Sequence, residues 1–340
     1  MITASPAGRQ HPPAWQVALA DAITDPRELL ALLDLDPALA PPALLAAGSF
    51  ALRVPRGYAA RMRRGDPADP LLLQVLPRAG EMLEAPGFSA DPLHEAAAQA
   101  APGLLRKYPG RALLVTTAAC GVHCRYCFRR EFPYARTGAG RWRQALAAIA
   151  ADPSIEEVVL SGGDPLALTD ARLAELSAGL AAIAHVRRLR IHTRQPIVLP
   201  ERVDGGLQRW LAGLRSPPII VLHANHANEI DVTVMRACER LRACGAVLLN
   251  QSVLLRDIND TPAALAALAH RLADCGVLPY YLHLLDRVRG TSHFEVEQQR
   301  AVHIVRALSA MLPGYLVPRL VREIPGETAK HQIATGRADD

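Results

Sequence analysis

Residues 156–184, EEVVLSGGDPLALTDARLAELSAGLAAIA, hold the pattern that decides the fold. A short apolar, β-branched run is followed by a polar loop with two glycines and then by a longer amphipathic stretch. This is the pattern of a strand followed by a helix. The same unit recurs from Arg111 onward. The apolar runs that we expect to be strands are residues 112–116, 157–160, 189–193, 219–223, 247–251 and 280–285.

Helical patterns lie after these strands, at residues 141–151, 170–184, 206–214, 231–243, 262–275 and 295–311. Six strands that are each followed by a helix predict a parallel sheet with helices outside it. The spacing favours a barrel over a doubly wound sheet, although periodicity alone does not separate the two. The predicted fold class is α/β, a partial (βα)6 TIM-like barrel with a helical N-terminal extension.

The change in composition along the chain predicts three segments. Residues 1–105 are rich in Ala, Leu and Pro and show helical patterns at residues 26–35 and 91–101, so we expect a helical N-terminal extension without a function of its own. Residues 106–312 are the predicted barrel core, and residues 313–340 are the predicted C-terminal segment.

Composition and charge exclude several classes of protein. Half of the 340 residues are hydrophobic and 21% are charged with mixed signs, which is not the composition of a disordered chain. The net charge of +5 is mild for this length and does not demand nucleic acid. The first residues lack the apolar region of a signal peptide, and no run of about 18 apolar residues is present. We expect a cytoplasmic protein without membrane or nucleic-acid partners.

Polar residues follow each predicted strand. Because the C-terminal ends of barrel strands meet at one mouth, where active sites lie, we expect six segments to present polar groups to one cavity. These residues are Cys120, Cys124 and Cys127; Ser161, Gly162, Gly163 and Asp164; His192, Arg194 and Gln195; His223, Asn225 and His226; Asn250, Gln251 and Ser252; and Asp286.

The spacing of Cys120, Cys124 and Cys127 is C-x3-C-x2-C. Three thiolates on one loop can ligate three corners of a [4Fe–4S] cluster, which leaves the fourth iron open. The amino and carboxylate groups of S-adenosylmethionine would chelate that iron, and electron transfer would release a 5′-deoxyadenosyl radical. The aromatic Tyr126 before the third cysteine favours this interpretation. The alternatives are chance or a zinc site, for which His123 would be an awkward fourth ligand.

Two further features accompany the cysteine loop. Ser161, Gly162, Gly163 and Asp164 follow a buried strand, where glycines allow the backbone to approach a ligand closely. In radical S-adenosylmethionine proteins such a segment binds the methionine amino group, and an ordinary tight turn is the alternative. The other cysteines lie in helical patterns and are expected to be buried small hydrophobic residues; they are Cys238, Cys244 and Cys275.

With these motifs the sequence resembles the lysine 2,3-aminomutase family over roughly residues 107–330. The resemblance implies a radical S-adenosylmethionine barrel and an isomerase, an intramolecular aminotransferase that also requires pyridoxal 5′-phosphate. A strong radical breaks the unactivated Cβ–H bond, and pyridoxal carries the migrating nitrogen. The matching segments are residues 108–111, 120–130, 161–166, 192–194, 223–229, 250–260, 280–286 and 325–330.

The resemblance also implies roles for single residues. Lys330 matches the lysine that binds pyridoxal phosphate; it is one of two lysines in the chain, and a surface lysine is the alternative. Arg129 matches the arginine that pairs with the substrate carboxylate. Tyr108 and Arg111 match residues that bind pyridoxal phosphate, and Asp286 and Glu323 match acids that receive the substrate ε-ammonium group. The S-adenosylmethionine site is matched by His192, His223 and Gln251. For each of these two histidines, a structural role in packing is the alternative.

Two departures separate the chain from the free-lysine catabolic enzymes. Glu323 stands where those enzymes have aspartate, and the chain ends ten residues after Lys330 without their zinc-binding cysteines. The compact form is similar to enzymes that make (R)-β-lysine for elongation factor P, to which a separate ligase attaches it. The implied partners are L-lysine, elongation factor P, the β-lysine ligase, a reducing flavodoxin or ferredoxin, and a second copy of the chain in a homo-oligomer.

Other functions stay open at this point. The chain could be a free-lysine or arginine 2,3-aminomutase of catabolism or antibiotic synthesis, because a guanidinium also pairs with carboxylates. Glutamate is disfavoured, since Asp286 and Glu323 would repel its side chain. A radical enzyme without pyridoxal phosphate that acts on RNA or protein is more distant. A non-catalytic iron–sulfur or nucleic-acid-binding module is disfavoured by 4% aromatic residues and dispersed arginines.

Overall fold

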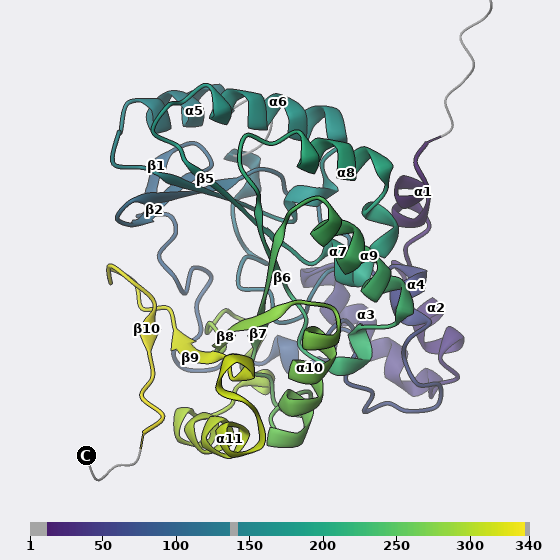
Figure 1. The fold of residues 1–340 in the computed structure, drawn as a ribbon. Coiled ribbons are helices and arrows are strands. Elements are labelled where there is room, and N and C mark those ends of the chain that lie inside the picture. The colour runs from purple at the N-terminus through teal and green to yellow at the C-terminus, as the bar shows by residue number, and fades with distance from the viewer. Residues whose placement is uncertain (1–11, 137–141, 337–340) are drawn as a thin grey trace, which may run out of the picture.

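The computed structural model of the chain describes residues 12–136 and 142–336. Within these residues one ten-stranded sheet runs in the order β1 to β10, so that neighbours in sequence are neighbours in the sheet (Figure 1). The strands are β1 (Gln99–Ala101), β2 (Leu104–Tyr108), β3 (Arg111–Val115), β4 (Glu157–Ser161), β5 (Arg188–Thr193), β6 (Ile219–Leu222), β7 (Val247–Val253), β8 (Leu278–His283), β9 (Arg319–Arg322) and β10 (His331–Gln332).

Strands β3 to β9 are parallel, whereas β1, β2 and β10 pair antiparallel at the two edges. The α/β partial barrel is therefore confirmed, and all six predicted strands are present. Strand β9 extends the parallel set beyond the six predicted strands. Its sequence, RLVR, is short and bears an arginine at each end, so no apolar run reveals it. This strand leads directly into the segment that carries Glu323 and Lys330.

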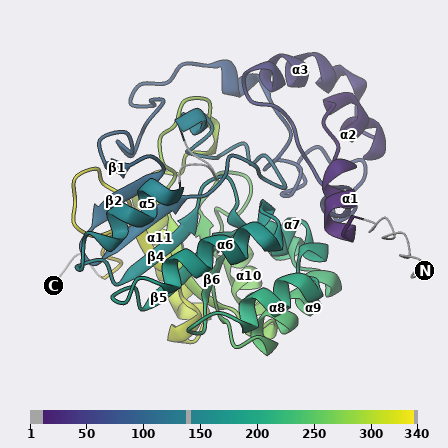
Figure 2. The same cartoon turned by 90° about the horizontal axis from the view of Figure 1, so that it is seen from above.

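Helices cover the outside of the barrel (Figure 2). Among the described residues, four α-helices precede it. Side-chain caps define several helix starts: Thr169, Asp231 and Thr261 each accept a hydrogen bond from a backbone amide in the first turn. The helices are α1 (Ala14–Ala20), α2 (Pro26–Leu32), α3 (Ala40–Ser49), α4 (Arg56–Ala59), α5 (Trp142–Ala150), α6 (Asp170–Ala181), α7 (Gln195–Val198), α8 (Gly205–Ala212), α9 (Val232–Ala243), α10 (Pro262–Asp274) and α11 (Gln298–Met311).

One predicted helix is wrong. Residues 91–98 form turns, and β1 follows them. The Asp91 carboxylate accepts hydrogen bonds from the amides of Glu95 and Ala96, and His94 has a φ of +50°, which interrupts a helix. The first residue of the predicted helix at 141–151 lies outside the described residues, and the rest agrees with α5.

The N-terminal helices pack against the barrel through a core of their own. Trp15, Tyr58 and Leu71 belong to this core, together with Val122 of the cysteine loop and Val198 of α7. The predicted boundary near residue 105 stays a prediction, and β2 runs across it. No helix in the described part of the chain has the length and apolar character needed to span a bilayer.

Candidate active site

A cavity of about 490 Å³ lies at the C-terminal ends of the parallel strands. The cavity brings together every residue predicted to bind metal, cofactor or substrate. It is lined by Tyr108, Arg111, Cys120, Cys124, Cys127, Arg129, Ser161, Gly162, Gly163, Asp164, His192, His223, Gln251, Asp286, Glu323 and Lys330. Three of the polar residues after strands do not line it, namely His226, Asn250 and Ser252.

The cysteine loop between β3 and α5 presents three free thiols to the cavity. Burial raises the pKa of the Cys127 thiol to about 11, and it also raises the pKa of Cys120. Thiols in such surroundings ionise when a metal binds them, because the metal stabilises the thiolate. Cys238 and Cys275 are buried in the helical layer, and Cys244 is half-buried.

The donor set fits an iron–sulfur cluster better than a single ion. Among the described residues no three His, Cys, Asp or Glu side chains converge on one ion-sized site. A cubane cluster has a different requirement, because each thiolate binds a different iron. His123, the fourth ligand considered for zinc, belongs to no such group in the described part of the chain. Its Nδ1 lies 2.8 Å from the Ala51 carbonyl oxygen, and its ring stacks on Phe50.

Backbone contacts join the cysteine loop to the loop after β4. The amides of Gly163 and Asp164 donate to the carbonyl oxygens of Thr117 and Ala119, both at 2.7 Å. Gly162 has a φ of +133°, and a Cβ at Gly163 would lie 2.4 Å from the Ala119 oxygen. Only glycine permits this approach, which leaves the backbone of the loop beside the thiols.

The Asp164 carboxylate is occupied inside the protein. It accepts hydrogen bonds from the hydroxyl of Thr193 and from the amides of Arg194 and Gln195, which fixes the loop after β4 to the loop after β5. Burial raises the pKa of Asp164 to about 6 even though these hydrogen bonds favour the anion. A contact between this carboxylate and S-adenosylmethionine stays a prediction.

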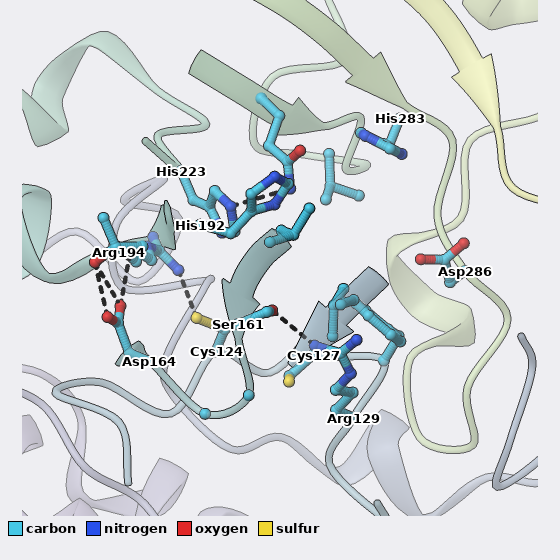
Figure 3. Close-up of a pocket in the computed structure, with 18 of the residues that line it drawn as sticks. Cys124, Cys127, Arg129, Ser161, Asp164, His192, Arg194, His223, His283 and Asp286 are labelled. Atoms are coloured by element: carbon cyan, nitrogen blue, oxygen red, sulfur yellow. Dashed lines mark hydrogen bonds between the residues drawn. The ribbon is translucent and has the colours of Figure 1, made fainter. Parts of the chain in front are cut away.

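Neutral imidazoles form one wall of the cavity (Figure 3). The Gln251 amide donates to His223 Nε2 at 3.0 Å, and the rings of His192 and His223 meet edge to face. Burial lowers the pKa of His223 to about 3 and holds the pKa values of His192 and His283 well below the usual range. The Nε2 atoms of His192 and His283 are buried without a hydrogen-bond partner, so they can bind a polar ligand.

A chain of ion pairs crosses the cavity wall. Arg129 makes a bidentate pair with Glu95 at 2.7 Å, and its Nη1 donates to the Ser161 hydroxyl. Lys107 lies 3.0 Å from Glu95 and 2.7 Å from Glu323. The sequence did not identify Glu95 and Lys107 as site residues. Glu95 lay in the wrongly predicted helix, and the scarcity of lysine, which drew attention to Lys330, applied equally to Lys107.

The two acids predicted to bind the substrate differ in their surroundings. Glu323 Oε2 accepts a hydrogen bond from Lys330 Nζ at 2.6 Å. Burial alone would raise the pKa of Glu323, but Lys330 and Lys107 outweigh it and hold the pKa below its usual range. Asp286 has no cationic partner within 4.0 Å among the described residues, and burial together with Glu323 raises its pKa to about 7. Asp286 is therefore the acid available to a cationic ligand.

An aromatic, anionic ligand would fit beside Lys330. The Arg111 guanidinium lies over the Tyr108 ring at 4.8 Å, and Lys330 Nζ lies 6.0 Å from the centre of the Tyr281 ring. The Tyr108 hydroxyl and Arg111 Nε are buried without hydrogen-bond partners. Unsatisfied donors near a cation are suited to phosphate and phenolate oxygens.

Comparison with known proteins identifies the family. The 4Fe-4S single cluster domain matches residues 108–190. L-lysine 2,3-aminomutase of Escherichia coli (strain K12) is 50% identical over 322 residues, 93% of each chain, and the Haemophilus influenzae enzyme of that name is 45% identical over 93% and 94%. A solved radical SAM methyltransferase from Sphaerobacter thermophilus has a TM-score of 0.42 at 18% identity, covering 64% of this chain and 68% of its own. The sequence identity across nearly the whole chain places this protein in the family of L-lysine 2,3-aminomutases, which are isomerases.

Proposed function

We propose that this protein converts L-lysine to β-lysine with a [4Fe–4S] cluster, S-adenosylmethionine and pyridoxal 5′-phosphate. One observation carries the proposal: a single cavity holds three free thiols together with Lys330 and Asp286. When bound, the cluster and S-adenosylmethionine supply a radical that breaks a C–H bond, and pyridoxal phosphate carries the migrating amino group. The residues of the chain bind and orient these groups.

Cys120, Cys124 and Cys127 hold the cluster in this proposal. The backbone of the loop after β4, which packs against the cysteine loop at Gly162 and Gly163, would bind the methionine amino group, and Ser161 and Asp164 anchor that loop. S-adenosylmethionine also needs polar contacts away from the iron. The neutral imidazoles of His192 and His223 and the amide of Gln251 provide them, because they add no charge that would repel the sulfonium.

Lys330 binds pyridoxal phosphate, with Tyr108 packed on the pyridine ring and Arg111 paired with the phosphate. The support lies in the two unpartnered donors described above and in the ion pair that holds Lys330 next to Glu323. The lysine also follows Gly326, in the loop between β9 and β10. A lysine in such a loop can be displaced when the substrate amine takes its place.

L-lysine lies between a cation and an acid. Arg129 pairs with the substrate carboxylate and Asp286 with the ε-ammonium group, and Glu323, which contacts Lys107 and Lys330, is the second acid on that side. In Figure 3 Asp286 lies on one side of the site and Arg194 and Asp164 on the other, and Arg129 lies between the two sides. The uncompensated carboxylate of Asp286 disfavours glutamate as the substrate. It does not by itself disfavour arginine.

The proposed biological role is the modification of elongation factor P. We infer that the product is (R)-β-lysine for the modification of elongation factor P, with a β-lysine ligase as the next enzyme and a cytoplasmic flavodoxin or ferredoxin as electron donor. Support comes from the Escherichia coli relative, which is matched over 93% of its own length, whereas the Clostridium subterminale enzyme is matched over 67% of its length. A homo-oligomer is part of the proposal.

The test is an anaerobic assay of reconstituted protein with L-lysine, followed by chiral analysis of the product. We expect (R)-β-lysine in reactions that contain S-adenosylmethionine, and none when it is omitted. L-Arginine is offered at equal concentration as the competing substrate. Preferential formation of β-arginine would overturn the lysine assignment, and (S)-β-lysine would overturn the assigned enantiomer. Ligase-dependent transfer of the product to elongation factor P tests the biological role separately.

A further inference from the structure

Arg194 donates hydrogen bonds to the cysteine loop from the opposite wall of the cavity. It directly follows β5, and its side chain is buried. Its Nη1 lies 2.7 Å from Cys124 Sγ and 2.5 Å from the Tyr126 hydroxyl (Figure 3). An arginine side chain carries five N–H donors in a rigid plane, so a contact made by one nitrogen fixes the directions of the others.

The other terminal nitrogen of Arg194, Nη2, is held by three buried acceptors, of which the Tyr58 hydroxyl at 3.3 Å is the most distant. Nη2 donates to Glu229 Oε2 at 2.8 Å and to Gln74 Oε1 at 2.7 Å. Glu229 is itself immobilised, because its Oε1 accepts from the amides of Asn225 and His226 and from the Gln74 side chain. The guanidinium therefore cannot turn away from the Cys124 sulfur without breaking this network.

Gln74 belongs to the N-terminal extension, which also grips the backbone of the cysteine loop. The Gln74 carbonyl accepts from the Arg125 amide at 2.8 Å, and the Arg53 carbonyl accepts from the His123 amide at 3.0 Å. The Arg125 guanidinium pairs with the buried Glu81. One segment of the extension thus fixes both the loop that carries Cys124 and the arginine that donates to it.

We propose that Arg194 is a positioning residue for the iron–sulfur cluster, because it orients the Cys124 thiolate and raises the reduction potential of the cluster. The N-terminal extension holds the Arg194 side chain in this position through Gln74. A hydrogen bond and a positive charge at a cluster sulfur stabilise the reduced form, which carries one more negative charge. The inference rests on the assignment of Cys124 as a cluster ligand, and it does not depend on the substrate.

The experiment measures the midpoint potential of the reconstituted cluster by an EPR-monitored redox titration, without lysine or pyridoxal phosphate. Arg194→Lys keeps the charge but cannot reach Cys124 and Glu229 at once. We expect about a tenfold shift of the one-electron equilibrium toward the oxidised form, which is about 59 mV. Arg202→Lys is the matched control, since Arg202 is equally buried but donates to the Leu166 and Leu168 carbonyl oxygens. It should leave the potential unchanged.

Two further variants make the test independent of folding problems. Gln74→Met removes an acceptor of Arg194 and should lower the potential by a smaller amount. The double variant Arg194→Gln with Glu229→Gln removes both charges together, so that no buried carboxylate is left unpaired. If Arg194→Lys does not retain about four irons, the midpoint potential of this double variant tests the proposal instead.

An unchanged midpoint potential in either Arg194 variant that retains its iron would overturn the proposal, as would an equal shift in Arg202→Lys. Because only the cluster is measured, the result is separate from the assay for β-lysine. A protein that made no β-lysine but showed the expected shift would refute the proposed substrate and leave this inference standing.

Discussion

The ammonium group of Lys107 lies 2.7 Å from the carboxylate of Glu323, a residue 216 positions away in the sequence. Lys107 also contacts Glu95, which holds Arg129. Glu323, one of the two acids predicted for the ammonium end of the substrate, is therefore linked through Lys107 and Glu95 to Arg129, which is predicted for the carboxylate end.

The first prediction concerns this lysine. Lys107→Met should lower the free energy of unfolding, because two buried carboxylates each lose a cation. The loss should be smaller than the roughly 3–5 kcal/mol of a buried charge left wholly unpaired, since Lys330 and Arg129 remain. Urea unfolding of the two proteins measures it, with Lys107→Arg as the charge-conserving control. Equal stability of Lys107→Met and the unmutated protein would show that the ion pairs contribute no net stabilisation.

The second prediction concerns the attachment of pyridoxal phosphate. Borohydride treatment of the reconstituted protein should fix the pyridoxyl group on Lys330, and peptide mapping identifies the lysine. Lys330→Ala should lose the pyridoxal absorption band and amino migration while its cluster remains reducible. Because the chain has one other lysine, the experiment has a clear alternative result. A pyridoxyl group on Lys107 would contradict the assignment.

The third prediction concerns the cluster ligands. Anaerobic reconstitution should give about four irons and four sulfides per chain. Replacement of Cys120, Cys124 or Cys127 by alanine should abolish the formation of 5′-deoxyadenosine, because each thiolate holds a different iron. Cys238→Ala and Cys275→Ala are controls that should keep the cluster, since both residues are buried in the helical layer. Normal cleavage of S-adenosylmethionine by a variant without one of the three would refute the ligand set.

The fourth prediction concerns substrate choice. Asp286→Asn should severely weaken lysine turnover and preserve S-adenosylmethionine binding, because the amide cannot compensate the ε-ammonium charge. Norleucine, which lacks that group, should be a poor substrate of the unmutated protein, since it leaves the carboxylate facing Glu323. Parallel assays of lysine and norleucine in both proteins measure the difference. Equal use of the two substrates by the unmutated protein would end the assignment of Asp286.

The fifth prediction concerns pH. The pKa of Asp286 in the free protein is raised to about 7 by burial and by Glu323, with Lys330 and Lys107 opposing the shift. The carboxyl is therefore protonated and neutral below this value, and it binds the lysine cation only when ionised. We expect kcat/KM for lysine to rise about tenfold per pH unit below 7 and to level off above it, because this ratio reports groups of the free enzyme. The pH profile of Asp286→Asn should lack this limb.

Much of the fold could be read from the sequence because its information is local. The apolar run at residues 157–160 predicts β4 almost to the residue, since a buried parallel strand needs a continuous apolar run. The cysteine spacing likewise predicts a cluster loop, because three ligands within eight residues need no tertiary information. Strand β9 escaped prediction because its four residues are half charged, and it forms only when β8 offers a hydrogen-bonding edge.

The pairing of charges was decided only by the tertiary structure. Asp164 and Glu323 both line the cavity, and their roles as ligand-binding residues stay predictions, but the sequence did not predict their partners in the protein. Folding surrounds Asp164 with amides from the loop after β5 and gives Glu323 two lysines. Arg194 meets Cys124 only because parallel strands bring their ends to the same rim of the barrel. Periodicity reports which face of an element is apolar. Which charge neutralises which depends on distances across the barrel, and those are set by strand register and by the packing of the N-terminal helices.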